Sequence, residues 1–213
     1  MHKKLYLLTS LLTLALIVLT SICFKITPAT SLGLILLITA LVVIFHGISM
    51  KIADLLDEHG MTSFKGSAIY YGILWGGFAS LWVIIDVHLA NAMLATILAF
   101  LVRRRLDYIN HAIAGAMVVI TFFVNSTFLL SEFTFLFIGL TVLGMLKDRI
   151  GESHKTSGFF YRLSEFASYS IVTSLAYSLV FNNWIVFFAI TLSTLSYGLI
   201  KYYFHKWGYY KTI

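Results

Sequence analysis

Two acidic segments of the chain share one spacing. The first reads DLLDEHGMTS from Asp54, and the second reads DRIGESHKTS from Asp148. Each places a second acid, Glu58 or Glu152, four residues after the first, and a Thr-Ser pair four residues later. If both segments are helical, the two acids of each are neighbours on one face, where like charges repel unless a cation lies between them. The pattern therefore suggests cation binding.

Mg²⁺ is the cation that this pattern favours, because hard divalent ions prefer oxygen ligands and bind through carboxylates and substrate phosphates. The predicted ligands are Asp54, Asp57, Glu58, Asp148 and Glu152, with Asp54, Glu58, Asp148 and Glu152 as the catalytic set. Nearby basic residues would contact the phosphate directly; they are Lys51, Arg105, Arg149 and Lys155. The competing interpretation is two solvated loops with weak surface ion pairs.

The composition indicates where these segments lie. Of the 213 residues, 60% are hydrophobic and 11% are charged, and the mean hydropathy is +0.91. A soluble domain carries about 25% charged residues, so we expect an integral membrane protein, all-α, with one domain over residues 1–213. The net charge of +6 is assigned to cytoplasmic loops and lipid head groups rather than to nucleic acid.

Eight apolar runs are candidates for transmembrane helices, because a helix needs about 20 residues to span the hydrocarbon core. They cover residues 5–24, 32–50, 68–85, 87–102, 112–124, 128–145, 167–181 and 184–204. The fourth, fifth and seventh runs are short, so seven or nine spans remain open. The first run also resembles a secretory signal, but it is long and no Ala-x-Ala site follows it, so we interpret it as a helix.

Basic residues predict the orientation of these spans. With eight spans and both termini in the cytoplasm, only Lys25 of the fifteen Lys and Arg residues falls outside, as the positive-inside rule expects. The location predicted from this bias is multi-pass in the plasma (cytoplasmic) membrane. The chain divides into two four-helix halves, 1–106 and 107–213, each with an acidic segment after its second helix.

The layout resembles that of the UbiA superfamily of intramembrane prenyltransferases. LKDRIGESHKTSG (Leu146 to Gly158) looks like the second acidic motif of that family, and KIADLLDEHG (Lys51 to Gly60) stands in the place of the first. RRRLDYINHAIAGAM (Arg103 to Met117) is similar to the segment after the fourth helix. The chain differs in having Met50 and Lys51 where the family has Asn-Asp, and Glu at the end of both motifs.

The resemblance implies a function. Mg²⁺ would hold the diphosphate of a polyprenyl donor against the acids, Asn110 and His111 would orient the acceptor, and the partners would be membrane lipid and an isoprenoid diphosphate. Two other classes remain open: a small-solute or ion transporter, for which His46 and Glu132 are the deepest ionisable residues, and a lipid-head phosphotransferase.

Overall fold

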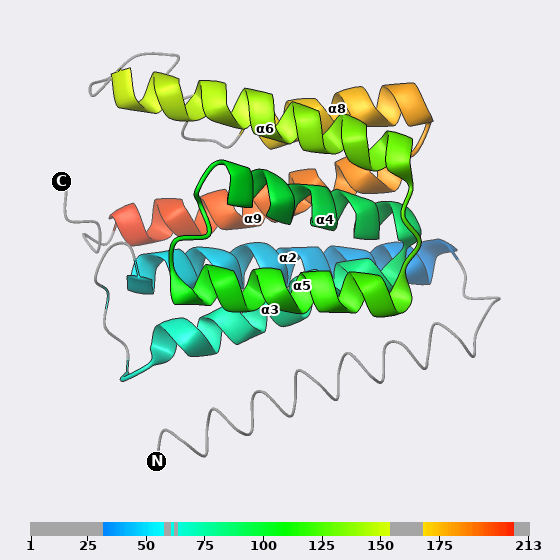
Figure 1. The fold of residues 1–213 in the computed structure, drawn as a ribbon. Coiled ribbons are helices and arrows are strands. Elements are labelled where there is room, and N and C mark those ends of the chain that lie inside the picture. Colours follow the sequence, from blue (N-terminus) through cyan, green and yellow to red (C-terminus); the bar gives the residue numbers. More distant parts are fainter. Residues whose placement is uncertain (1–31, 58–60, 62–63, 154–167, 207–213) are drawn as a thin grey trace.

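A computed structural model describes residues 32–57, 61, 64–153 and 168–206, and within them every regular element is an α-helix. The prediction of an all-α protein is thus confirmed for this part of the chain. The helices, labelled as in Figure 1, are α2 (Leu32–Asp57), α3 (Ser67–Ile85), α4 (Val87–Val102), α5 (Ile109–Asn125), α6 (Leu130–Ser153), α8 (Ser168–Phe181) and α9 (Trp184–Lys206).

Four of these helices are long and apolar enough to cross a membrane. They cover Leu34–Asp57, Ser67–Ile85, Leu130–Arg149 and Trp184–Phe204, while α4, α5 and α8 are shorter apolar helices. Large apolar side chains also cover the outside, and Phe123, Val124 and Leu130 are each more than two-thirds exposed. An exterior of this kind is consistent with a membrane protein, because water would disfavour so much exposed apolar surface.

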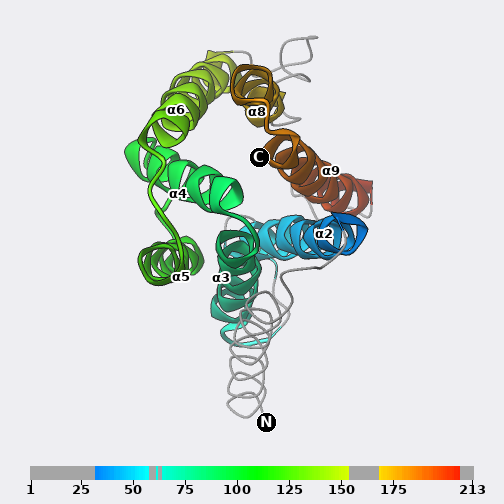
Figure 2. The ribbon, with the colours of Figure 1, turned by 90° about the vertical axis from the view of Figure 1, so that its right-hand side faces the viewer.

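Successive helices run in opposite directions (Figure 1), and each packs against the next along the chain except α5 and α6, which α4 separates (Figure 2). Viewed along the helices, the order of packing is α5, α3, α2, α9, α8 and α6, and α4 packs against both α6 and α3 (Figure 2). The contacts of α2 with α9 and of α4 with α6 join the two predicted halves into one bundle. The ends of α2 and α6 that carry Asp54 and Asp148 therefore lie at the same end of the bundle, called here the acidic end (Figure 1).

Both acidic segments continue as helix beyond their apolar runs, as the spacing of their acids predicts. Helix α2 extends past Met50 to Asp57, and α6 extends past Met145 to Ser153. Helix α4, in contrast, coincides with its apolar run. The Asp86 carboxylate fixes its start by accepting hydrogen bonds from the backbone N–H groups of His88 (2.8 Å) and Leu89 (3.1 Å), and the helix ends at Val102.

Two glycines permit the close helix contacts on which the acidic end depends. A Cβ at Gly47 of α2 would lie 2.3 Å from the Ser193 carbonyl oxygen of α9, and a Cβ at Gly72 of α3 would lie 2.7 Å from Cα of Asn110 in α5. Small residues let helix backbones approach in this way. These approaches place α9 against α2 and α5 against α3, and side chains from α9 and α5 reach Asp54.

Candidate functional site

Asp54 is the centre of a buried polar cluster at the acidic end. Its Oδ2 accepts a hydrogen bond from the Tyr197 hydroxyl at 2.6 Å, and its Oδ1 lies 2.9 Å from Nε2 of His111. The Lys51 ammonium lies 3.2 Å from the Tyr197 hydroxyl and 3.8 Å from Asp54 Oδ2. These four residues, the Asp54 cluster, bring α2, α5 and α9 together.

Burial makes the charges of this cluster interdependent. The side chains of Lys51, Asp54 and His111 are 4%, 6% and 8% exposed, respectively. A buried charge is tolerated when an opposite charge and hydrogen bonds accompany it, and Lys51 and Asp54 satisfy that condition for each other. An ionic pair inside apolar helices is costly to keep, so its presence marks a candidate functional site.

The position of His111 follows from the first turn of α5. Asn110 is fully buried against Gly72, and its Oδ1 accepts a hydrogen bond from the backbone N–H of His111. The His111 ring packs edge-on against Trp75 and Tyr108. On its other side, Nδ1 lies 3.9 Å from the carboxylate of Asp107, which is 59% exposed. His111 therefore stands between a buried acid and one that reaches the surface.

Asp148 forms a second ionic group, the Asp148 cluster. Its Oδ2 accepts hydrogen bonds from Nε (3.1 Å) and Nη2 (2.8 Å) of Arg103, and its Oδ1 accepts one from Nη2 of Arg105 at 2.8 Å. Arg103 also donates to the Tyr169 hydroxyl at 3.0 Å and lies over the Tyr169 ring. Burial lowers the pKa of Arg103, but Tyr169 and Asp148 more than compensate and raise it above its ordinary value, so the guanidinium stays charged.

The backbone after α4 aims both arginines at Asp148. The N–H of Arg105 bonds the carbonyl of Phe100 at 2.8 Å, and the N–H of Arg104 bonds that of Leu101 at 3.0 Å. Arg104 has φ 57°, the left-handed conformation that ends many helices. A Cβ at Gly144 of α6 would lie 2.3 Å from Nη1 of Arg103, so a side chain there would displace this guanidinium.

The structure divides the predicted site residues between the two clusters. Lys51 and His111 join Asp54, with Asn110 beside them, whereas Arg105 joins Asp148. Asp57 is partly buried at the end of α2, and Arg149 is exposed on α6. Three predicted residues have no described side chain: Glu58 and Lys155 lie outside the described residues, and for Glu152 only its place in α6 is described.

Three contributors were absent from the prediction: Tyr197, Arg103 and Tyr169. Tyr197 and Tyr169 stand in apolar runs, where one tyrosine carries no signal by itself. Arg103 opens the Arg103 to Arg105 run, which indicates a basic surface but not which guanidinium turns inward. These three residues could be found only from the packing of helices distant in sequence.

In the described part of the acidic end, two of the predicted Mg²⁺ ligands, Asp54 and Asp148, lie in separate clusters. No three His, Cys, Asp or Glu side chains among the described residues are grouped as metal ligands. Each oxygen of Asp54 and Asp148 lies within hydrogen-bond distance of a protein nitrogen or hydroxyl group, so a metal at either residue would share its oxygen ligands with these contacts. Because the set also needs Glu58 and Glu152, the Mg²⁺ site stays a prediction.

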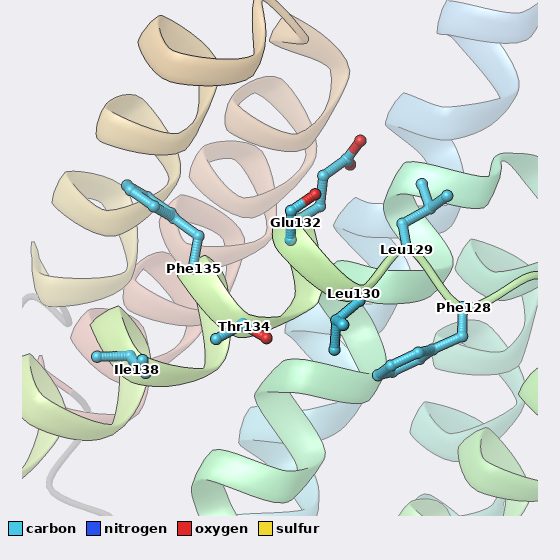
Figure 3. A pocket seen from close by; sticks show the side chains of 8 residues that line it. Phe128, Leu129, Leu130, Glu132, Thr134, Phe135 and Ile138 are labelled. Carbon is cyan, nitrogen blue, oxygen red and sulfur yellow. The ribbon is translucent and has the colours of Figure 1, made fainter.

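A third ionisable group lies at the other end of the bundle. The Glu132 carboxylate of α6 lies 2.7 Å from Nδ1 of His88 and accepts a hydrogen bond from the Tyr177 hydroxyl. An apolar pocket of about 810 Å³ runs beside this Glu132 cluster, along residues 128–138. Figure 3 shows the Glu132 carboxylate pointing away from the side chains of Phe128 and Leu130. The other polar residues of the pocket are Ser131 and Thr134, so it offers no cation for an anionic head.

Comparisons with known proteins were made for the whole chain: no protein-family model, no curated protein and no solved structure matches it.

Proposed function

We propose that the protein is a prenyltransferase-like enzyme of the cytoplasmic membrane, with eight spans and both termini inside, that acts on a polyprenyl diphosphate at the acidic end. The observation that carries the proposal is the arrangement of Asp54 and Asp148. Both lie at one end of the bundle, and each is held among cationic side chains. An apolar bundle with charged groups concentrated at one end suits a substrate with an apolar chain and an anionic head.

The proposed reaction transfers the prenyl chain from the diphosphate to an acceptor molecule. The bond between prenyl C1 and the diphosphate oxygen breaks, and its electron pair leaves with the diphosphate. A nucleophilic atom of the acceptor bonds to C1 and loses its proton. Charge therefore accumulates on the leaving diphosphate, so cationic groups placed there lower the barrier.

The described residues have distinct roles in this scheme. His111 is positioned to take the acceptor proton, because Asp54 orients its ring and stabilises the imidazolium that forms. Lys51 and Arg105 supply positive charge for the diphosphate, and Arg149 and Lys155 are assigned the same role from sequence. When bound, Mg²⁺ would add Lewis-acid neutralisation of the leaving group, with Asp54, Asp57, Glu58, Asp148 and Glu152 as the proposed ligands.

The test is transfer of a radiolabelled prenyl diphosphate to a membrane lipid extract by the purified protein in nanodiscs, with and without Mg²⁺. We expect labelled lipid from the wild type with Mg²⁺. Asp54→Asn should reduce turnover by about 100-fold or more, the usual contribution of positioned acid–base groups. Glu132→Gln is the matched control, because Glu132 also binds one histidine and one tyrosine but lies at the opposite end.

Full activity of Asp54→Asn would contradict the proposed site. Equal loss in Asp54→Asn and Glu132→Gln would mean that turnover follows general stability of the bundle. No labelled product from the folded wild type with any extract would remove the proposed reaction.

A proton-coupled or ion transporter is the second candidate function. The observation that favours it is the burial of an ionisable residue, His46, inside helix α2. This residue is 6% exposed within α2, its Nδ1 lies 2.9 Å from the Ser193 hydroxyl, and its ring stands against Trp75 and Trp82. Its Nε2 has no hydrogen-bond partner among the described residues. Ionisable residues inside a membrane often mark ion or proton pathways.

The transporter is tested in proteoliposomes that contain a pH-sensitive dye. A transporter would dissipate a pH gradient faster than empty liposomes, and His46→Gln would abolish the difference while His88→Gln would not. Rates equal to those of empty liposomes would contradict this second candidate.

A further inference from the structure

The two arginines of the Asp148 cluster outnumber their single acid. Arg103 and Arg105 carry two positive charges, and the described ion pairs give them one shared carboxylate. Lys147 lies within electrostatic range of Asp148 and of both arginines. Guanidinium pairs match phosphate oxygens in charge and in planar, two-pronged geometry. Asp148 thus occupies donors that would suit a more highly charged anion.

The group is constructed as a binding site with one fixed side and one open side. Arg103 is the fixed side: its side chain is 3% exposed, Tyr169 binds its third nitrogen, and Gly144 leaves room for its guanidinium. Arg105 is the open side, with 53% of its side chain exposed. Asp148 is 16% exposed, so an anion approaching from the surface meets Arg105 and the carboxylate before Arg103.

We propose that Arg103 and Arg105 form a binding site for a phosphate ester, and that Asp148 is its internal competitor, displaced when the phosphate group binds. The inference rests on the proposed function in taking this ester to be the head of the prenyl donor. A phosphate monoester carries nearly two negative charges at neutral pH, and a diphosphate head carries more, so either balances both arginines, whereas Asp148 balances one. Displacement also releases the Asp148 carboxylate for other partners.

The experiment measures binding of inorganic diphosphate by calorimetry, with EDTA present and the protein in phosphatidylcholine nanodiscs. Asp148→Asn should bind diphosphate about tenfold more tightly than the wild type, because hydrogen bonds to a charged group that must be broken contribute that much. Its melting temperature should fall without anion, since Arg103 loses its acid, and should rise with diphosphate more than that of the wild type.

Two variants separate this effect from a general change of charge. Asp107→Asn removes the same charge from an exposed position on the same connection, and screening should hold its affinity within about twofold of the wild type. Arg105→Gln should weaken binding at least about tenfold, alone or combined with Asp148→Asn, because a charged donor is lost. Arg105 is largely exposed, so this variant should fold.

Folded Asp148→Asn that binds diphosphate no more tightly than the wild type would overturn the inference. If Asp148→Asn does not fold, wild-type affinity in Arg105→Gln would overturn it instead. Farnesyl diphosphate in a second series identifies the source of the phosphate: tighter binding than inorganic diphosphate indicates a lipid head, and equal binding a free anion. Anion binding without prenyl transfer would leave this site standing and remove the proposed enzyme.

Discussion

Among the described residues, two carboxylates at opposite ends of the bundle each contact one histidine and one tyrosine. Asp54 is bound by His111 and Tyr197, and Glu132 by His88 and Tyr177. Their surroundings differ. Asp54 is 6% exposed and has Lys51 at 3.8 Å, whereas Glu132 is 14% exposed and its one described ion-pair partner is His88, itself 31% exposed.

The difference shows that the set of hydrogen-bond partners does not by itself define a candidate site. The Glu132 cluster can draw on water through its exposed histidine, and its neighbouring pocket is apolar. The Asp54 cluster contains the amino group of Lys51 and shares its end of the bundle with Arg103, Arg105 and Lys147. Within the part of the chain that the structure describes, the acidic end thus combines a buried acid–base pair with positive charge for an anion, and the Glu132 end does not.

Replacing Asp54 or Glu132 by alanine should give the largest difference in stability loss between the two ends of the bundle. Asp54→Ala should destabilise the protein by about 3 to 5 kcal/mol, because Lys51 would remain buried without its acid. Glu132→Ala should cost about 1 to 3 kcal/mol, the penalty for leaving the Tyr177 hydroxyl unsatisfied, since His88 can turn to water. The measurement is the melting temperature in detergent.

The double variant Lys51→Met with Asp54→Leu is the control for that prediction. Replacing both charges by apolar groups removes the unpaired ammonium, so most of the lost stability should return. A double variant as unstable as Asp54→Ala would show that packing, and not the buried charge, determines the loss.

Moving α9 away from α2 should cause the next largest loss of stability and activity. The change in hydrogen bonding should be confined to the Asp54 cluster. Gly47→Ala places a Cβ against the Ser193 carbonyl, and overpacking of this kind costs about 1 to 3 kcal/mol. The wider spacing should also break the bond between Tyr197 and Asp54, so prenyl transfer should fall with stability. The matched control is Gly198→Ala in α9, where nothing lies within 4 Å of the added Cβ; equal losses in both variants would contradict this account.

Removing one tyrosine hydroxyl at each end of the bundle should cost less stability and should separate stability from activity. Tyr197→Phe and Tyr177→Phe each delete a hydrogen bond to a carboxylate, which contributes about 1.5 to 3 kcal/mol. Melting temperatures should therefore fall similarly. Turnover and its pH profile should change only in Tyr197→Phe, because that hydroxyl holds the acid that orients His111. A changed pH profile in Tyr177→Phe would assign a functional role to the Glu132 cluster instead.

How much of this arrangement the sequence predicts depends on whether a feature is local. The extensions of α2 to Asp57 and of α6 beyond Asp148 follow from acids spaced one helical turn apart. The sequence predicts that Lys51, Asp54 and His111 belong to one site, but it does not predict the contacts between them. Tyr197 could not be foreseen, because the approach of α9 to α2 depends on Gly47 and Ser193, which are far apart in sequence.

The pairing of Asp148 with two arginines was also beyond the sequence, for a conformational reason. Acids repeated in both halves predict one shared cation, and that site stays a prediction. What the repeat does not indicate is the left-handed turn at Arg104, beside which both neighbouring arginines bind Asp148. Nothing in the letters Arg-Arg-Arg distinguishes the residue that adopts φ 57° from the two that bind. The turn therefore decides whether Asp148 faces guanidinium groups or another acid.

A substitution at Arg104, in that turn, should have the smallest effect of those considered. It changes the backbone preference without altering either arginine that binds Asp148. Arg104 is exposed, and a non-glycine residue in the left-handed region costs about 1 kcal/mol relative to glycine. Arg104→Gly should therefore raise stability slightly, by up to about 1 kcal/mol, after the added flexibility of the unfolded chain is subtracted. Diphosphate affinity should stay unchanged, because Arg103 and Arg105 keep their directions. A loss of affinity would show that Arg104 itself contacts the anion, and that the positive charge of the acidic end, rather than the fixed pair, determines binding.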